Sequence, residues 1–405
     1  MEVKNQKNGL LMGIRVLDLA DEKASFCSKL LADMGATVVK IERPGGDPSR
    51  GIGPFWKGSP HPERSLFFQY NNANKLGITL DLEQDAGRKI FFKLLDKMDI
   101  VVETFTPGFM KELGLSFEVL REVNPRIILV SVTGFGQDGP RSKYKSCDLV
   151  ASAFGGSMYI SGSPSSPPLK PCGEQSYYTT SLFVAVAVLL ALRKRAKTGK
   201  GEHIDISMQE AVISTLDHVM VRYFYDQMIP KRQGSLHWDN SFCILPCKDG
   251  YILLTLFQQW ETLVELMAGD DMAEDLIKER WRDKEYRLKH IDHIIGVLER
   301  WTETHTTDEL FELGQLMHFP WAPIHSPMEV LKNPQLKTQD FFYEMDHPEI
   351  GVSVKYPGVP YKFSRAPLNR QRRAPLIGED NISIYRTELG LSHEDIQRLS
   401  SLKAI

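Results

Sequence analysis

The chain has few of the residues that a disulfide-rich protein or a metalloprotein requires. Its 405 residues include only five cysteines, odd in number and scattered, which indicates reduced thiols rather than a disulfide framework. Cys243 and Cys247 form the one close pair, and no second Cys or His pair lies nearby in sequence to complete a zinc site. We therefore expect no metal ion.

Other absences exclude further classes. No G-x-G-x-x-G motif follows the first predicted strand, so a nicotinamide or flavin site has no support. A formal net charge of −3 gives no reason to expect nucleic acid or an anionic membrane as a partner. The apolar run Leu182–Leu192 is shorter than the roughly 20 residues that a bilayer requires. The first residues lack the apolar core of a signal peptide, and we expect a cytoplasmic protein.

Strand and helix patterns alternate through the N-terminal half. Residues 13–19 and 36–42 are predicted strands on either side of a helix over 23–34, which is a βαβ unit with a parallel sheet. The next predicted elements are strands over 76–82, 99–103 and 126–133, helices over 84–98 and 108–123, and a long irregular loop over 49–75. Length and pattern together favour two domains.

The stretch 168–211 organises the rest of the chain. Its apolar middle predicts a buried helix, which ends in a basic turn and the Gly-bearing segment Thr198–Gly201, before a strand over 203–207. The Gly-rich segment 134–140 follows a predicted strand, where it is either a ligand-binding loop or a plain turn. Farther on, we expect helix over 209–229, a hinge at 230–234, a hairpin over 242–256 and helices over 259–318.

Eight short blocks occur in the order found in the class III coenzyme A transferases. They are GIRVLDL (13–19), LLADMGATVVKIERPGGDPSR (30–50), NNANKLGITLDL (71–82), VVETFTPG (101–108), NPRIILVSVTGFGQDGP (124–140), LRKRAKTGKGEHIDISMQEA (192–211), CKDGYI (247–252) and APLIGE (374–379). The sequence resembles this family over nearly its whole length. The resemblance implies an α/β fold with a Rossmann-like parallel-sheet large domain (1–229), an inserted smaller α+β domain (230–325), a C-terminal segment returning to the large domain (326–405), and an interlocked dimer.

The resemblance also implies a covalent mechanism. In this family an Asp carboxylate attacks the donor acyl-CoA, passes through a mixed anhydride and an enzyme–CoA thioester, and hands CoA to an acceptor acid. CoA thioesters are therefore the expected substrates, with no permanently bound cofactor. Family CoA-pocket positions are matched here by Arg43, Lys75, Leu80, Phe105, Lys145 and Met208. Each of these also fits ordinary surface charge or core packing.

The chain departs from the family at the nucleophile. The family's Asp position, counted back from Thr198, is occupied by Tyr177, and a phenol offers no carboxyl carbon to carry an acyl group or sulfur. The nearest acid is Glu174, which could take the role if the chain is locally shifted. Glu83 and Glu112 stand where relatives place cations near the nucleotide phosphates. We therefore expect the chain to lack the nucleophile.

A chain that keeps the fold without the nucleophile fits a heterodimer or heterotetramer, in which a homologous subunit carries the catalytic Asp. Within the family, the resemblance extends to the E-type subunits of enzymes that move CoA from succinyl-CoA to (R)-benzylsuccinate in anaerobic toluene degradation. Three alternatives stay open. They are a self-sufficient homodimer that uses Glu174, an acyl-CoA racemase, and a CoA-binding module without catalysis. Against the racemase, Cys147 stands beside Asp148 where that branch places a His, and Tyr177 replaces the second acid.

Overall fold

A computed structural model describes residues 9–237, 241–366 and 372–405. The chain forms two compact units, the larger comprising 1–158, 170–229 and 340–405, and the smaller 159–169 and 230–339. The smaller unit thus combines a short segment of the N-terminal half with a long segment over 230–339. The domain boundaries expected from the sequence, 1–229, 230–325 and 326–405, stay a prediction. The first eight residues, on which the signal-peptide argument depends, lie outside the described ranges.

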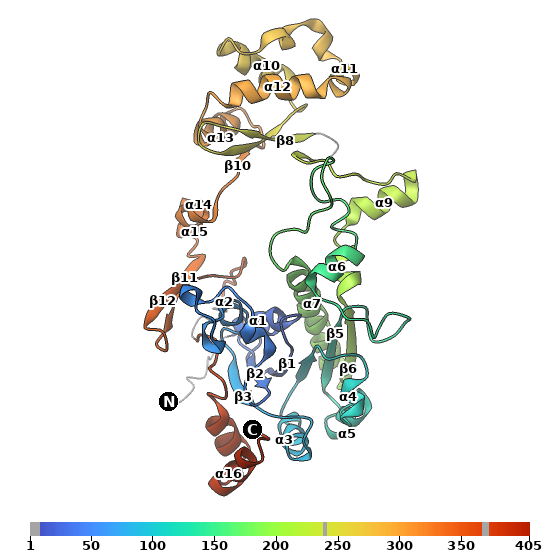
Figure 1. Cartoon of the computed structure of the whole chain (residues 1–405), viewed down its shortest axis with the longest axis vertical. Coiled ribbons are helices and arrows are strands. Elements are labelled where there is room, and N and C mark those ends of the chain that lie inside the picture. Colours follow the sequence, from blue (N-terminus) through green and yellow to red (C-terminus); the bar gives the residue numbers. More distant parts are fainter. Residues whose placement is uncertain (1–8, 238–240, 367–371) are drawn as a thin grey trace. The chain divides into compact units, whose positions relative to one another are not determined.

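A six-stranded parallel sheet forms the centre of the larger unit, in the order β3-β2-β1-β4-β5-β6 (Figure 1). Its strands are β1 (Arg15–Leu19), β2 (Thr37–Glu42), β3 (Leu76–Thr79), β4 (Ile100–Glu103), β5 (Ile128–Thr133) and β6 (Glu202–Ser207). Because helices cover both faces, the inner strands β4 and β5 are buried along their whole length rather than at alternate residues. The α/β fold class expected from the sequence is confirmed, and the interlocking of two chains stays a prediction.

Helices lie on both faces of this sheet. One face packs residues of α1 (Ser25–Asp33), α6 (Asp148–Phe154) and α7 (Gln175–Thr198) around Val38, Val102 and Val130. The other packs α3 (Asp85–Leu95), α4 (Phe109–Glu112), α5 (Phe117–Val123), the π-helix Ser383–Glu388 and α16 (His393–Ser401) around Leu17, Val101 and Leu129. The C-terminal segment therefore completes the hydrophobic core of the larger unit.

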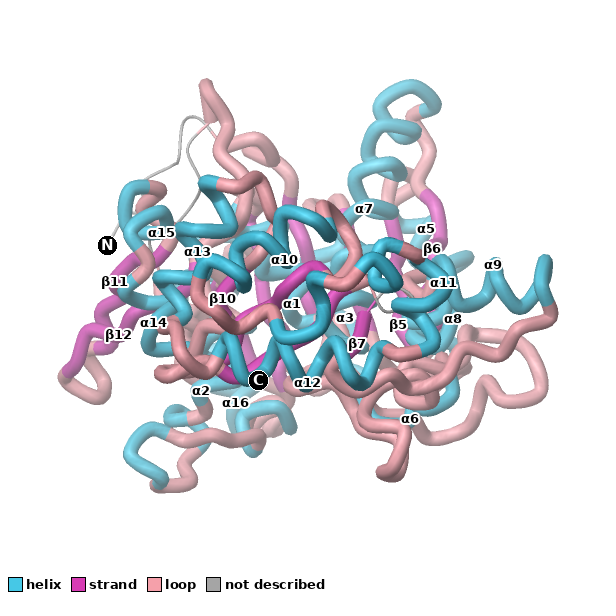
Figure 2. The backbone as a smooth tube through the Cα atoms, turned by 90° about the horizontal axis from the view of Figure 1, so that it is seen from above, coloured by secondary structure: helices cyan, strands magenta, loops and turns pink. Residues whose placement is uncertain are grey.

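Helix α7 runs alongside β5 and β6 (Figures 1 and 2). It ends at Gly199, whose φ of +72° suits a residue without a side chain, and a Cβ on Gly201 would lie 1.8 Å from the Ile127 carbonyl oxygen. The predicted Gly-bearing turn thus reflects close backbone contact. The expectation of a buried helix is wrong for one face, since Leu182, Val186 and Leu190 each expose more than half of their surface.

Helix α7 has 24 residues and is apolar enough to span a bilayer by length and composition. The prediction from the sequence considered only the shorter apolar run Leu182–Leu192 within it. The core helix of a soluble protein passes the same test. Here α7 packs against α1, α6 and α8 (Met208–Ile213) as well as the sheet, which is the packing of a core helix.

Three predicted segments differ from the structure. The loop over 49–75 contains three short 3₁₀ turns and the helix α2 (Leu66–Asn71). The strand over 76–82 ends at Thr79, and the helix over 209–229 is two helices, α8 and α9 (Asp217–Asp226). The larger unit also contains the antiparallel hairpin β11 (Phe342–His347) and β12 (Val352–Pro357) (Figure 2).

The smaller unit is built on a four-stranded sheet in the order β10-β9-β8-β7. Its strands are β7 (Leu236–His237), β8 (Phe242–Pro246), β9 (Tyr251–Thr255) and β10 (Ala322–Pro323), and its helices are α10 (Trp260–Gly269), α11 (Lys284–Lys289), α12 (Ile291–Thr302), α13 (Thr307–Leu316), α14 (Pro327–Lys332) and α15 (Pro334–Thr338). The predicted Asp-Gly hairpin is β8–β9. Trp281, Trp301 and Trp321 anchor a core separate from those of the larger unit.

Candidate functional site

A cavity of about 290 Å³ opens at the carboxyl ends of β1, β2, β3 and β4. Residues that directly follow those strands line it, among them Arg43, Leu80, Thr104 and Phe105. In open parallel sheets, ligands bind at this edge and near the point where the strand order reverses, here between β1 and β4. The position of the cavity is therefore that of a ligand site.

Three of the six residues proposed from the sequence for CoA binding meet in this cavity. Leu80 is buried in its wall, Phe105 is half-buried, and Arg43 is exposed at its edge. Lys145 lies instead in the exposed loop between β5 and α6, and Met208 is buried in the core beneath α7 and α8. These two positions do not line the cavity.

Lys75 directly precedes β3, is fully buried, and forms hydrogen bonds only within the protein. Its Nζ lies 2.7 Å from Asp18 Oδ2 and donates to the Ser25 carbonyl at 2.8 Å and to Asn72 Oδ1 at 2.7 Å. Burial lowers the pKa of Lys75 to about 8, although Asp18 opposes that shift. All three ammonium protons are used, so the structure gives Lys75 an internal role.

The cation at the cavity edge has an acidic partner. Arg43 Nη2 donates to Glu83 Oε1 at 2.6 Å, and both side chains are more than half exposed. Glu112 on α4 is exposed as well. The carboxylate of Glu83 competes with any anionic ligand for the guanidinium of Arg43. It also repels a phosphate directly, because both groups are negatively charged.

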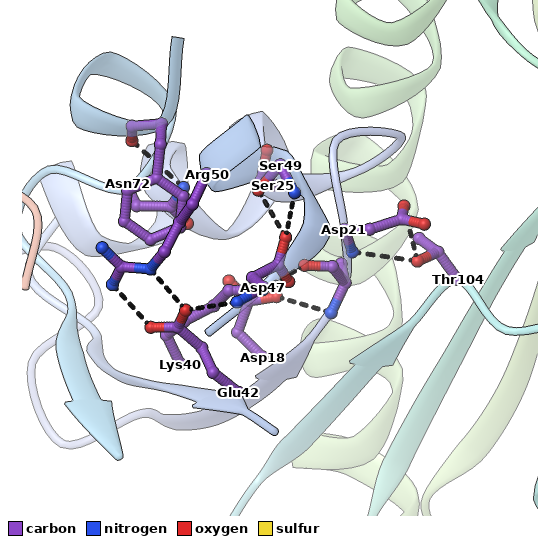
Figure 3. Close-up of polar contacts among 12 residues, drawn as sticks. Asp18, Asp21, Ser25, Lys40, Glu42, Asp47, Ser49, Arg50, Asn72 and Thr104 are labelled. Atoms are coloured by element: carbon purple, nitrogen blue, oxygen red, sulfur yellow. Dashed lines mark hydrogen bonds and ion pairs between the residues drawn. The ribbon is translucent and has the colours of Figure 1, made fainter. Parts of the chain in front are cut away.

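A buried polar network holds the loop after β2 (Figure 3). Gly46, Asp47 and Pro48 of this loop line both this cavity and a second one of about 560 Å³. Lys40 Nζ lies 2.7 Å from Asp47 Oδ2 and also donates to the carbonyl of Ala20. Arg50 donates to both oxygens of Glu42 at 2.6 and 2.7 Å. Sequence reasoning missed this network; its signal was a Lys and a Glu inside the apolar strand T-V-V-K-I-E.

Lys40 and Asp47 stabilise each other's charged forms. Burial by itself would lower the pKa of Lys40, but Asp47, Asp18 and Glu42 raise it overall. Burial would likewise raise the pKa of Asp47, but Lys40 and Ser49 lower it overall. The ion pair thus joins the β1–α1 loop, through Ala20, to the loop after β2, and it fixes two walls of the cavity.

Tyr177 occupies the first turn of α7, where its side chain is almost fully buried. Burial raises the pKa of its phenol, and the nearby acids Glu22 and Asp21 and the thiol of Cys147 raise it further. The hydroxyl therefore stays protonated at neutral pH, which is the wrong state for a nucleophile.

Asp148 neutralises the start of α7 from the neighbouring helix α6. Its Oδ1 accepts the backbone N–H of Ser176 at 2.7 Å and that of Tyr177 at 3.4 Å, while its Oδ2 lies 2.9 Å from Lys170 Nζ. A carboxylate at this position satisfies the free N–H groups and the positive end of the helix dipole. These donors are consequently already occupied by the protein itself.

Glu174 immediately precedes α7 and is only partly buried. Its carboxylate lies 3.7 Å from Lys170 Nζ. Burial raises the pKa of Glu174, Asp148 raises it further, and Lys170 opposes both effects. This arrangement gives Glu174 a reachable carboxyl next to the position of Tyr177.

The β1–α1 loop contributes further acids that sequence reasoning did not single out. Asp21 lines the cavity and exchanges two hydrogen bonds with Thr104, at 3.0 Å from the Asp21 N–H and 2.8 Å to its Oδ1 (Figure 3). Burial raises the pKa of Glu22, and the adjacent Asp21 adds to that shift. Across the described ranges, no group of His, Cys, Asp and Glu side chains is arranged as a metal site.

Comparisons with known proteins give a consistent family. A profile described as CoA-transferase family III matches residues 11–381. A Thauera aromatica protein named succinyl-CoA:(R)-benzylsuccinate CoA-transferase subunit BbsE is 32% identical, over 96% of this chain and 97% of that relative. A succinyl-CoA:mesaconate CoA-transferase from Haloarcula hispanica is 33% identical, over 94% and 96%. The crystal structure of a CAIB/BAIF family protein from Brucella suis has a TM-score of 0.85 at 29% identity, covering 95% of this chain and all of that one.

Proposed function

Because this chain belongs to CoA-transferase family III, as its sequence resemblance predicted, we propose that it is the subunit of a CoA-transferase that lacks the nucleophile. A homologous subunit carrying an Asp at the equivalent position would supply it. The proposed reaction moves CoA from succinyl-CoA to an aryl-substituted succinate such as (R)-benzylsuccinate.

Tyr177 is the observation that carries this proposal. A transferred CoA must be held as a thioester on a carboxyl carbon, and a phenol has none. The buried Tyr177 hydroxyl also has a raised pKa, so it resists ionisation. The chemistry of the phenol and its buried environment both support a chain without a nucleophile at this position.

The choice of acceptor rests on similarity. The Thauera aromatica relative is named as a subunit and acts on benzylsuccinate, which supports both the heteromeric assembly and the aryl-substituted acceptor. The Haloarcula hispanica relative is as similar and acts on mesaconate, another dicarboxylic acid. A substituted dicarboxylic acid is therefore the class of acceptor to test first.

Expression of the chain alone and together with its Asp-carrying homologue tests the proposal. We expect CoA exchange between succinyl-CoA and (R)-benzylsuccinate only from the complex. Mass spectrometry after trapping with hydroxylamine should find the activated carboxyl on the homologue. Robust exchange by the lone chain, or a trapped adduct on any of its side chains, would contradict the proposal.

A second candidate is a self-sufficient transferase that uses Glu174. Its position beside α7 and its partly exposed carboxyl group favour this reading. Glu174→Ala would then abolish exchange by the lone chain, whereas Tyr177→Phe, which keeps the aromatic ring, would not. Under the first proposal, the complex retains its activity with Glu174→Ala.

A further inference from the structure

A buried carboxyl lies directly behind the ligand cavity. Glu103 is the last residue of β4 and is 2% exposed. Its Oε2 accepts the backbone N–H of Phe105 at 2.7 Å, and Phe105 forms part of the cavity wall. Glu103 therefore holds the main chain at the point where β4 ends and the wall begins.

This carboxyl is connected to the far edge of the sheet. Glu103 lies opposite Ser131 of β5 in the parallel register, so the two side chains are neighbours on one face of the sheet. On its other side, Ser131 Oγ lies 2.9 Å from His203 Nε2 on the edge strand β6. The His203 ring is exposed and stacks on Phe117 at 5.6 Å. A row of neighbouring polar side chains thus leads from solvent to the cavity wall.

We propose that Glu103, Ser131 and His203 form a proton relay that transmits the protonation state of the exposed histidine to the wall of the ligand cavity. Ser131 has a single hydroxyl proton, so the two hydrogen bonds in the path must point the same way. When Glu103 is ionised, Ser131 donates to Glu103 and His203 Nε2–H donates to Ser131. When Glu103 takes the Ser131 proton, Ser131 takes the proton of His203 Nε2. One proton moves from imidazolium to carboxylate, and no electrons are exchanged.

The surroundings favour a proton on this path near neutral pH. Burial raises the pKa of Glu103 to about 7, with smaller contributions from Asp21 and Asp205, while the Ser131 and Phe105 hydrogen bonds oppose the shift. Partial loss of water contact lowers the pKa of His203, and the negative charges of Asp205 and Glu118 oppose that shift. On α5, Arg121 also faces this edge, above the Phe117 ring.

Glu103 is therefore a positioning residue rather than a catalytic one. Its ionised form holds the Phe105 N–H through a charge-assisted hydrogen bond, and its neutral form through a weaker one. Ionisation also adds a negative charge behind a cavity expected to take a phosphate-bearing ligand. The expected ligand, CoA, rests on the proposed function, whereas the relay itself does not.

The relay can be tested without any ligand. In protein with ¹⁵N-labelled Phe, the Phe105 amide signal should titrate with a midpoint near 7. Glu103→Gln should remove the titration, and Ser131→Ala should move the midpoint upward, because it removes a hydrogen bond to the charged form. His393→Ala, an exposed histidine on α16, is the matched control and should leave the Phe105 titration unchanged. A Phe105 amide that does not titrate, or one that titrates equally in Glu103→Gln, would overturn the relay.

Calorimetric titration with CoA then connects the relay to the cavity. We expect the dissociation constant to rise about fivefold between about pH 6 and pH 8 in the wild type, a typical coupling between two sites. Comparison with Glu103→Gln removes the contribution of CoA's own phosphates, so that variant should show a flatter profile. A wild type and Glu103→Gln with the same pH profile would contradict coupling to the cavity. If CoA fails to bind while Phe105 titrates, the ionisation of Glu103 behind the cavity wall stands and CoA binding by this chain fails.

Discussion

Replacing Glu103 by Gln should stabilise the protein at alkaline pH. Burial raises the pKa of Glu103 from 4.5 to about 7 in the folded chain. Since the folded state then holds this proton more tightly than the unfolded state does, the contribution of Glu103 to stability is fully present below about pH 4.5 and is lost progressively up to about pH 7. Above that pH, the difference corresponds to about 3 kcal/mol of lost stability.

Glutamine cannot ionise, so it avoids this loss. Its carbonyl still accepts the Phe105 N–H, and its amide group can donate toward Ser131 as the protonated acid would. We subtract about 1 kcal/mol for imperfect hydrogen-bond geometry, which leaves a gain of about 2 kcal/mol at pH 8 and almost none at pH 4.5.

Urea unfolding monitored at both pH values measures the effect. Glu112→Gln on α4 makes the same chemical change at an exposed position and should alter stability by less than about 0.5 kcal/mol. If Glu103→Gln is no more stable than the wild type at pH 8, the assigned ionisation of Glu103 is wrong. The same conclusion follows if its advantage is equal at both pH values.

Other substitutions follow from the same contacts. Lys75→Met should cost about 3–5 kcal/mol in urea unfolding, because it leaves the buried carboxylate of Asp18 without its ammonium partner. Lys145→Met, at an exposed position, should change stability little. Equal effects of the two substitutions would refute the internal role of Lys75. Glu83→Gln should free the arginine at the cavity edge and tighten CoA binding about fivefold at low salt, less at high salt; unchanged affinity would mean that this ion pair does not compete with the ligand. Asp148→Ala should cost about 2–4 kcal/mol, because it leaves the first N–H groups of α7 without their acceptor and Lys170 without its nearer carboxylate; an unchanged midpoint would contradict that cap.

The order of strands and helices in the larger unit was predictable from sequence. Apolar strand patterns, glycine-bearing turns and helix-period segments are local, and residues near each other in the chain determine them. Predictions failed where tertiary packing intervened, as in the loop over 49–75, where the helix α2 forms. The exposed face of α7 could not be inferred either, since an apolar run shows how much surface is apolar but not what covers it.

In the candidate site, too, some features could be predicted from the sequence and others depend on tertiary packing. Arg43, Leu80 and Phe105 follow successive strands, and the carboxyl ends of parallel strands meet at one edge, so their meeting was foreseeable. Lys75 carries the same type of charge as Arg43, but its burial against Asp18 depends on how α1 and β3 pack. A sequence gives the type of each side chain, whereas its environment depends on neighbours that are far away in the chain.

The sequence by itself determined the family and the parallel sheet, and it predicts a Tyr at the nucleophile position, because these depend on residue identity and spacing. Only the tertiary structure decided that Asp148 occupies the helix end beside that Tyr, and that Glu103, Ser131 and His203 lie next to one another on three neighbouring strands. Hydrogen bonds and pKa values are set by distances of a few ångströms and by exclusion of water, and both exist only once separate strands and helices are packed together.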